Sequence, residues 1–268
     1  MPRRRWSQWP RRFGTALTKT GGVAGLVGVA LTAAGATVSV PAILAIGGLT
    51  VGGSLVYAAY SAIPPKRQSA AELVGKNLSL HSLEAIEPAI LKLGVVGYTQ
   101  AGKTTFLKQA LHRESSTTRT NNVYATILAL QSSPTTYVAL LDGDGEQLPQ
   151  QFEIAEHADF LIIFLDHNES DNSISRSKDR LKEHERFLMQ LEYHLKRRGH
   201  LARLHLLLNK RDLWQTSQSA AELQQWLSAR AEQWKRANVA ADATWGIHSN
   251  RNADDIGKVV RLISEGAA

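Results

Sequence analysis

The sequence predicts an α/β fold with a mostly parallel central sheet and helices on both of its faces. From residue 89 onward, short apolar runs alternate with segments of helical spacing, a pattern typical of such sheets. One run, residues 159–165, reads DFLIIFL and is nearly all apolar, as expected for a strand buried on both faces. Ligands bind such sheets at the carboxyl ends of the strands, and three polar motifs lie there.

The elements follow one another in a regular order. We expect strands at residues 90–96, 122–130, 136–141, 159–165, 204–208 and 243–247, and helices at residues 103–112, 150–157, 175–198, 220–237 and 254–265. Residues 122–130 and 136–141 are expected to be neighbouring strands. The helix at 175–198 carries His184 and His194 among many charges, and we interpret it as a solvated face rather than a metal site.

Charge divides the chain into four regions: a basic tail (residues 1–20), an uncharged segment (21–65), an amphipathic, partly helical linker (66–88) and the α/β domain (89–268). The net charge of +7 comes almost entirely from the tail, which has six basic residues and no acid. The folded domain is therefore not expected to bind DNA or RNA. The absence of cysteine excludes disulfides, thiolate catalysis and cysteine metal sites.

The uncharged segment is long enough for two short membrane-spanning helices separated at Pro41. Basic residues on both sides of it favour a helical transmembrane hairpin with both ends in the cytoplasm. We therefore expect a bacterial or organellar inner-membrane location, contact with membrane lipid, and a folded domain facing the cytoplasm. Glycines spaced four apart would permit self-association of the helices. A single span at residues 43–63, a cleaved signal peptide and a buried soluble hairpin are the alternatives.

The first polar motif is a phosphate-binding loop. Residues 97–104 read GYTQAGKT, a full GxxxxGK[ST] pattern between a predicted strand and a predicted helix. Backbone N–H groups of such a loop surround phosphates, and the helix N-terminus adds a favourable dipole. Lys103 is expected to contact the β- and γ-phosphates, and Thr104 to ligate Mg²⁺. The predicted nucleotide-binding residues here are Gly97, Gln100, Ala101, Gly102, Lys103, Thr104 and Thr105.

The second motif, residues 142–145 (DGDG), follows a predicted strand. Such pairs often mark turns, but the position after the phosphate loop suits a DxxG switch. Asp142 would then hold Mg²⁺ through water, and the Gly145 N–H would contact the γ-phosphate.

The third motif, residues 209–212 (NKRD), ends another apolar run and would select the base. A carboxylate accepts two hydrogen bonds from guanine, which adenine does not offer, so Asp212 favours GTP over ATP. Asn209 belongs to the same predicted set, and Lys210 would pack over the base plane.

With these motifs in this order, residues 89–268 resemble the small GTPases of the translation-factor-related class, most closely the Era/TrmE-type branch. The specific match is Thr117–Thr118–Arg119, which resembles the TTR switch sequence of that branch. The resemblance implies a three-layer P-loop NTPase G domain. It also implies that Thr118 closes on Mg²⁺ and the γ-phosphate, with Thr120 as an alternative.

A guanine-contact loop is also implied. Ser249–Asn250–Arg251 is similar to the SAK sequence, with Asn and Arg in place of alanine and lysine. We therefore add Ser249 and Asn250 to the predicted nucleotide-binding residues. Gln100 stands where this branch often has an asparagine that ligates potassium, so cation-activated hydrolysis stays open.

The function implied is a membrane-anchored switch that binds GTP and GDP, needs Mg²⁺ and hydrolyses GTP slowly. Lys103, Thr118, Gly145 and Glu146 are the predicted catalytic residues. Because Glu146 stands where Ras-like proteins have a water-orienting glutamine, an activating protein is expected besides an unknown effector.

Two alternatives stand beside the switch. One is a GTP-binding subunit or scaffold of a membrane complex with little hydrolysis. An Era-like RNA or ribosome factor is disfavoured, because the chain ends after the last predicted helix.

Overall fold

The structure is a computed structural model that describes residues 67–111, 123–130, 135–143, 147–198, 201 and 203–267. The chain divides into two units, Met1–Gln68 and Ser69–Ala268, and the second contains the α/β domain. The strands are β1 (Gln68–Ser69), β2 (Asn77–Ser79), β3 (Ile86–Glu87), β4 (Leu91–Gly97), β5 (Tyr124–Leu130), β6 (Thr136–Asp142), β7 (Phe160–Leu165), β8 (Arg203–Leu208) and β9 (Asp242–Ile247). The helices are η2 (Ala70–Leu73), η3 (Leu80–Ala85), α3 (Lys103–Ala110), α4 (Leu148–His157), α5 (Lys178–Arg198), α6 (Arg211–Trp214), α7 (Ala220–Arg236) and α8 (Ala253–Ala267).

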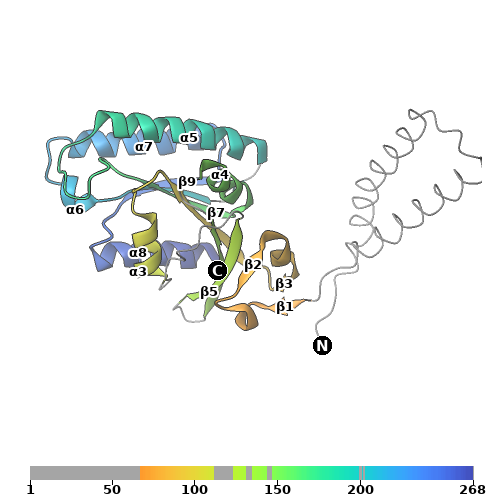
Figure 1. The fold of residues 1–268 in the computed structure, drawn as a ribbon. Helices are drawn as coiled ribbons and strands as arrows, with labels where there is room; N and C mark the ends of the chain where they lie inside the picture. Colours follow the sequence, from red (N-terminus) through yellow and green to blue (C-terminus); the bar gives the residue numbers. More distant parts are fainter. Residues whose placement is uncertain are drawn as a thin grey trace, which may run out of the picture. The chain divides into compact units, whose positions relative to one another are not determined.

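A seven-stranded sheet in the order β2-β5-β6-β4-β7-β8-β9 forms the centre of the domain (Figure 1). Strands β6, β4, β7, β8 and β9 run parallel, and β5 is antiparallel to both β6 and β2. The sequence pattern therefore predicted the mostly parallel sheet correctly. Because β4, β7 and β8 are adjacent, the loops that follow them meet at one edge of the sheet.

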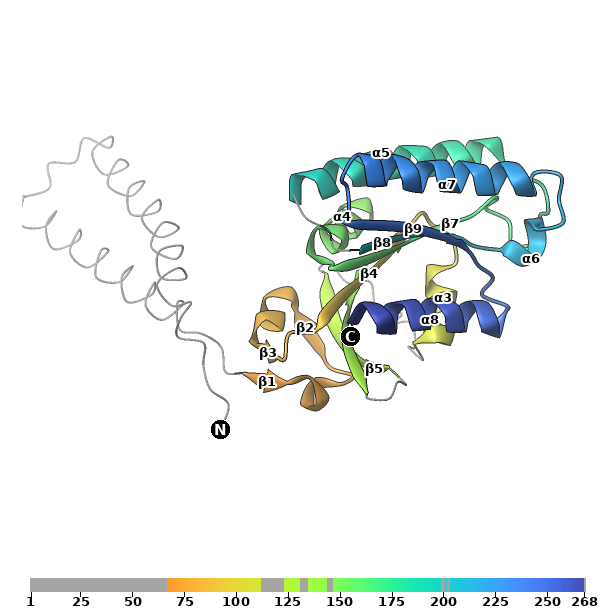
Figure 2. The same ribbon diagram turned by 180° about the vertical axis from the view of Figure 1, so that it is seen from behind.

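Helices cover both faces of the sheet, as Figures 1 and 2 show: α4, α5 and α7 lie on one face, and α3 and α8 on the other. Two apolar clusters match these layers. Phe187, Leu227 and Trp234 belong to the first cluster, and Phe106 and Ile263 to the second. All six residues of β7 are buried, as its apolar composition predicts for a strand between two helical layers.

Residues 70–87, predicted as part of a linker, contribute to the folded domain. Strand β2 pairs with β5, with Leu78 opposite Ala125. Leu73 and Ile86 are buried within the first apolar cluster. The segment consists of very short strands and 3₁₀ turns, which are too short to carry a periodic signal of their own.

The predicted transmembrane hairpin and inner-membrane location are corrected. Within the residues that the structure describes, no helix is both long and apolar enough to cross a bilayer. The longest, α5, has 21 residues but carries charges along its length, whereas a span needs about 20 predominantly apolar residues. The proposed hairpin itself, residues 21–65, lies outside the described residues, as does the self-association expected of it.

Candidate functional site

The predicted phosphate-binding loop connects β4 to α3. Its backbone turns through positive φ angles at Gln100 (65°) and at Gly102 (98°). Among non-glycine residues that the structure describes, only Gln100, Lys210 and Asn238 have positive φ. Two of these three therefore lie in predicted nucleotide motifs, and unusual backbone angles concentrate at functional sites.

Gly102 lies against the predicted base-recognition motif. A Cβ placed on Gly102 would lie 2.1 Å from Asn209 Nδ2 and 2.8 Å from Asn250 Nδ2. Asn209 Nδ2 donates to the Ala101 carbonyl at 2.9 Å, and Asn250 Nδ2 donates to the Gly102 carbonyl at 2.9 Å. Two asparagines from distant parts of the chain thus hold the phosphate loop directly.

The Lys103 ammonium folds back over the loop. Its Nζ donates to the Gly97 carbonyl at 2.5 Å and to the Tyr98 carbonyl at 2.9 Å. The pKa of Lys103 is lowered from 10.5 to about 8: burial has the largest effect, the charge of Arg180 acts in the same direction, and the charge of Asp166 acts in the opposite direction. Two carbonyls therefore hold the ammonium at the loop, while burial disfavours its charged form.

This lowered pKa predicts proton uptake on nucleotide binding. Above pH 8 the free protein holds Lys103 largely neutral, whereas bound phosphate favours the charged ammonium and raises its pKa. We expect GTP affinity to fall by up to about tenfold per pH unit above 8, by proton linkage. Calorimetry at pH 8.5 in two buffers of different ionisation enthalpy measures the uptake.

The control for that experiment is Lys103→Arg, whose guanidinium stays charged throughout this range. At saturating nucleotide, the Lys103→Arg protein should take up no proton when GTP binds. Wild-type protein that binds GTP at pH 8.5 without proton uptake would contradict the assignment of Lys103 to the phosphates.

The base-recognition motif follows β8. Asp212, in α6, accepts a hydrogen bond from Ser249 Oγ at 2.6 Å on Oδ1, and its Oδ2 lies 3.3 Å from Arg251 Nη1. The fold therefore brings Asp212 together with the predicted guanine-contact loop, 37 residues away in sequence. Arg251 is two-thirds exposed (66%), so its ion pair with Asp212 is open to water and weak.

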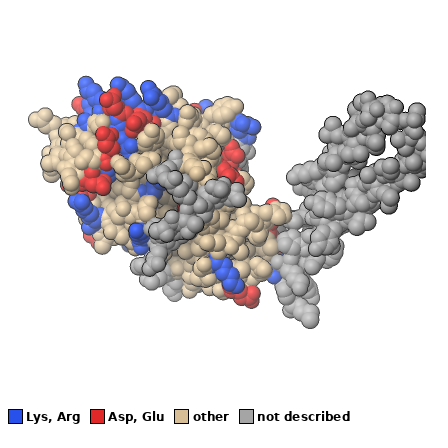
Figure 3. Space-filling view, in the orientation of Figure 1, with Lys and Arg blue, Asp and Glu red and all other residues tan. Residues whose placement is uncertain are grey.

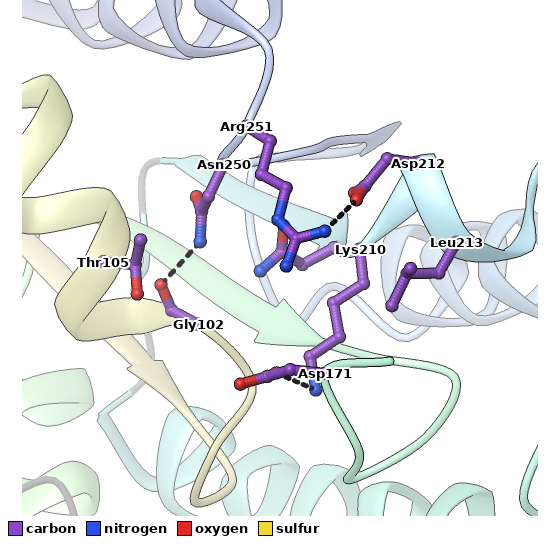
Figure 4. A pocket seen from close by; sticks show the side chains of 9 residues that line it. Gly102, Thr105, Asp171, Lys210, Asp212, Leu213, Asn250 and Arg251 are labelled. Carbon is purple, nitrogen blue, oxygen red and sulfur yellow. Dashed lines mark hydrogen bonds and ion pairs between the residues drawn. The ribbon is translucent and has the colours of Figure 1, made fainter. Parts of the chain in front are cut away.

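One cavity of about 160 Å³ joins the two motifs. Gly102, Thr105, Asp171, Asn209, Lys210, Asp212, Leu213, Asn250 and Arg251 line it (Figure 4). In Figure 4 the Arg251 side chain reaches toward Asp212, and Asn250 bridges to Gly102. The phosphate loop and the base-recognition motif thus form two walls of the same small cavity.

Lys210 lines the cavity, and its head group contacts two acids. Its stem lines the cavity, but its Nζ lies 2.9 Å from Asp166 Oδ2 and 3.0 Å from Asp171 Oδ1. A long lysine stem can cover an apolar surface while its head group binds an acid elsewhere. Contact of the stem with a base is compatible with this geometry.

Two of the predicted magnesium ligands, Asp142 and Thr104, lie among the described residues. Asp142 ends β6, which lies beside β4, and Thr104 is exposed in the first turn of α3. Asp142 accepts hydrogen bonds from Tyr124 Oη and from the Gly143 N–H, each at 3.0 Å. No cluster of three potential His, Cys, Asp or Glu ligands occurs among the described residues, and Mg²⁺ sites commonly use one or two carboxylates together with phosphate oxygens and water.

Several predicted residues lie outside the described residues. They are Thr117, Thr118, Arg119, Thr120, Gly145 and Glu146. Their predicted roles in closing on the γ-phosphate and in hydrolysis stay predictions.

The structure also reveals a buried charged cluster that the sequence interpretation missed. Arg180 and His184 on α5 are 3% and 0% exposed, and both contact Asp166, which is itself fully buried. The solvated-face interpretation was therefore wrong for these two residues, although it suits others on α5: Figure 3 shows basic and acidic side chains intermixed over the region of α5 and α7. Helical periodicity could have indicated this burial from the sequence, since Arg180 and His184 continue the buried stripe of Phe187, Leu188 and Leu191.

Comparison with known proteins shows limited similarity. No protein-family model matches the chain, and no curated protein sequence matches it. Similar solved structures include bacterial selenocysteine-specific elongation factor EF-Sec, at 14% identity and a TM-score of 0.45, with 67% of this chain and 29% of that chain covered. Another is translation elongation factor SelB from Methanococcus maripaludis in complex with the GTP analogue GppNHp, at 15% identity and a TM-score of 0.41, with 67% and 34% covered. The chain therefore spans about a third of the length of these proteins.

Proposed function

We propose that this chain is a magnesium-dependent GTP-binding protein that hydrolyses GTP slowly and acts as a switch. The observation that carries the proposal is the shared cavity, in which Gly102 of the phosphate loop and Asp212 of the base-recognition motif are both wall residues. In this proposal the loop surrounds the phosphates and the Asp212 carboxylate selects the purine, so that both contact one nucleotide.

Guanine recognition requires a small rearrangement. Both carboxylate oxygens of Asp212 have partners, Ser249 on one and Arg251 on the other. An exposed ion pair such as Asp212–Arg251 is worth about 0–1 kcal/mol, whereas each hydrogen bond of guanine to a carboxylate is worth about 1.5–3 kcal/mol. Guanine therefore outcompetes the arginine for the carboxylate, and Arg251 swings aside as the base enters.

The triphosphate would be held by the loop backbone and by Lys103, which exchanges the Gly97 and Tyr98 carbonyls for phosphate oxygens. Thr104 and Asp142 would hold Mg²⁺, which neutralises phosphate charge as the terminal bond breaks. Thr118, Gly145 and Glu146 would complete the site around the γ-phosphate. An activating protein and an effector are the partners that such a switch needs.

Single-turnover hydrolysis tests this function. Purified protein in excess over GTP, with saturating Mg²⁺, should release phosphate slowly. Lys103→Ala should reduce the rate by about a hundredfold or more because an electrostatic contact to the transferring phosphoryl group is lost. The matched control is Lys258→Ala, which removes an exposed lysine of α8 and should not change the rate. Tight GTP binding without any release in the wild type would limit the protein to nucleotide binding and refute hydrolysis.

A further inference from the structure

Asp166 occupies a central position between the two halves of the proposed site. It follows β7 directly, and β7 lies between β4, which leads into the phosphate loop, and β8, which leads into the base-recognition motif. Its carboxylate is fully buried. Hydrogen bonds from His184 and Arg180 hold the pKa of Asp166 below its usual value although burial acts to raise it, so the group is a carboxylate at neutral pH.

Toward the phosphate loop, Asp166 acts through Arg180. The guanidinium Nε lies 2.6 Å from Asp166 Oδ1, and Nη2 lies 3.2 Å from Oδ2. The same Nη2 donates to the Thr99 carbonyl of the loop at 2.6 Å, and the guanidinium lies 5.1 Å from the centre of the Tyr98 ring. One side chain from α5 therefore fixes two consecutive residues of the phosphate loop.

Toward the base-recognition motif, Asp166 acts through Lys210. Lys210 Nζ lies 2.9 Å from Asp166 Oδ2 and also donates to the Asn168 and Glu169 carbonyls, at 3.0 Å and 3.2 Å. Lys210 itself has a left-handed φ of 60°, which these contacts help to hold. The Asp166 carboxylate is thus linked to the phosphate loop through Arg180 and to the base-recognition motif through Lys210.

We propose that Asp166 and Arg180 are positioning residues that hold the phosphate loop in register with the base-recognition motif. The inference rests on the proposed nucleotide site and adds to it residues outside the three sequence motifs. Arg180 binds both oxygens of Asp166 with two guanidinium nitrogens and donates to a loop carbonyl from one of them. A lysine has one nitrogen and cannot reproduce this planar, bidentate geometry. Because Thr99 belongs to the phosphate loop, we expect Arg180 to affect phosphate binding more than base binding.

The test compares Arg180→Lys and Arg180→Gln with the wild type for binding of GTP and GMP in the presence of Mg²⁺. GMP lacks the β- and γ-phosphates that the loop would hold, so it reports on the base half of the site. We expect both variants to lose about tenfold or more in GTP affinity, the equilibrium effect of one charge-assisted hydrogen bond, and much less in GMP affinity. Arg180→Lys should keep most of the melting temperature, because it still offers a positive charge to Asp166.

The matched control is Arg230→Gln. Arg230 is a mostly buried arginine of α7 that pairs with Glu185 of α5 and does not line the cavity. The Arg230→Gln substitution should lower the melting temperature and leave the ratio of GTP to GMP affinity unchanged.

Two results would overturn the proposal while wild-type GTP binding stands: unchanged GTP affinity in both Arg180 variants, or equal proportional losses for GTP and GMP. Absence of GTP binding by the wild type would instead refute the proposed function.

Discussion

Replacing Asp212 by asparagine is expected to remove the preference for guanine. Asparagine has nearly the same shape and can still accept the hydrogen bond from Ser249 Oγ, so the loop should stay folded. It offers only one acceptor oxygen, and its amide NH₂ faces the exocyclic amine of guanine, where two donors then oppose each other. Losing one charge-assisted bond and leaving a donor unpaired should reduce GTP affinity by about a hundredfold or more.

The same substitution should favour xanthine nucleotides. Xanthine keeps the N1–H of guanine and has a carbonyl in place of its amine, so an asparagine amide can accept from one and donate to the other. Competition binding with GTP, XTP and ATP on the wild type and Asp212→Asn measures the change. Asp254→Asn, an exposed acid at the start of α8, is the control and should keep the wild-type order. An Asp212→Asn protein that still preferred GTP would show that another group reads the base.

Gly102→Ala is expected to disable the site and weaken the fold together. The alanine Cβ would lie 2.1 Å from Asn209 Nδ2, and a φ of 98° is costly for any residue with a Cβ, by about 1–3 kcal/mol. Relieving the clash moves Asn209 and Asn250 away from the loop carbonyls that they hold. We expect at least about a hundredfold loss of GTP affinity, because the loop and the base motif share these contacts.

Chemical unfolding and GTP titration of the same samples separate the two effects. Gly257→Ala is a sensitive control, since a Cβ at this helical position meets nothing within 4 Å. It should stabilise α8 by about 0.5–1 kcal/mol and leave binding unchanged. Gly102→Ala protein with wild-type stability and wild-type affinity would contradict this geometry of the loop.

Local patterns predicted most of the domain. Strands β4, β6 and β8 are largely apolar, and each leads into one of the three polar motifs. Their order therefore placed Gly102 and Asp212 at the same edge of the sheet. The contact between Asn250 and the Gly102 carbonyl could not be predicted, because it depends on the distance between loops that are 148 residues apart.

The buried ionic cluster shows why charged residues are hard to interpret from sequence. Arg180 lies on a helix rich in exposed charges, and a charged residue is most often solvated. Its burial depends on Asp166, a partner on another element, to compensate its charge. Only the helical phase shared with Phe187 and Leu191 indicated that Arg180 faces the core.

The central claim is that one nucleotide lies between the phosphate loop and Asp212. The most direct measurement is equilibrium binding of GTP, GDP and ATP to the purified chain with Mg²⁺. We predict that GTP and GDP bind at least about a hundredfold more tightly than ATP, as expected when a buried acceptor site rejects the wrong base. No measurable affinity for guanine nucleotides, or equal affinity for GTP and ATP, would contradict it.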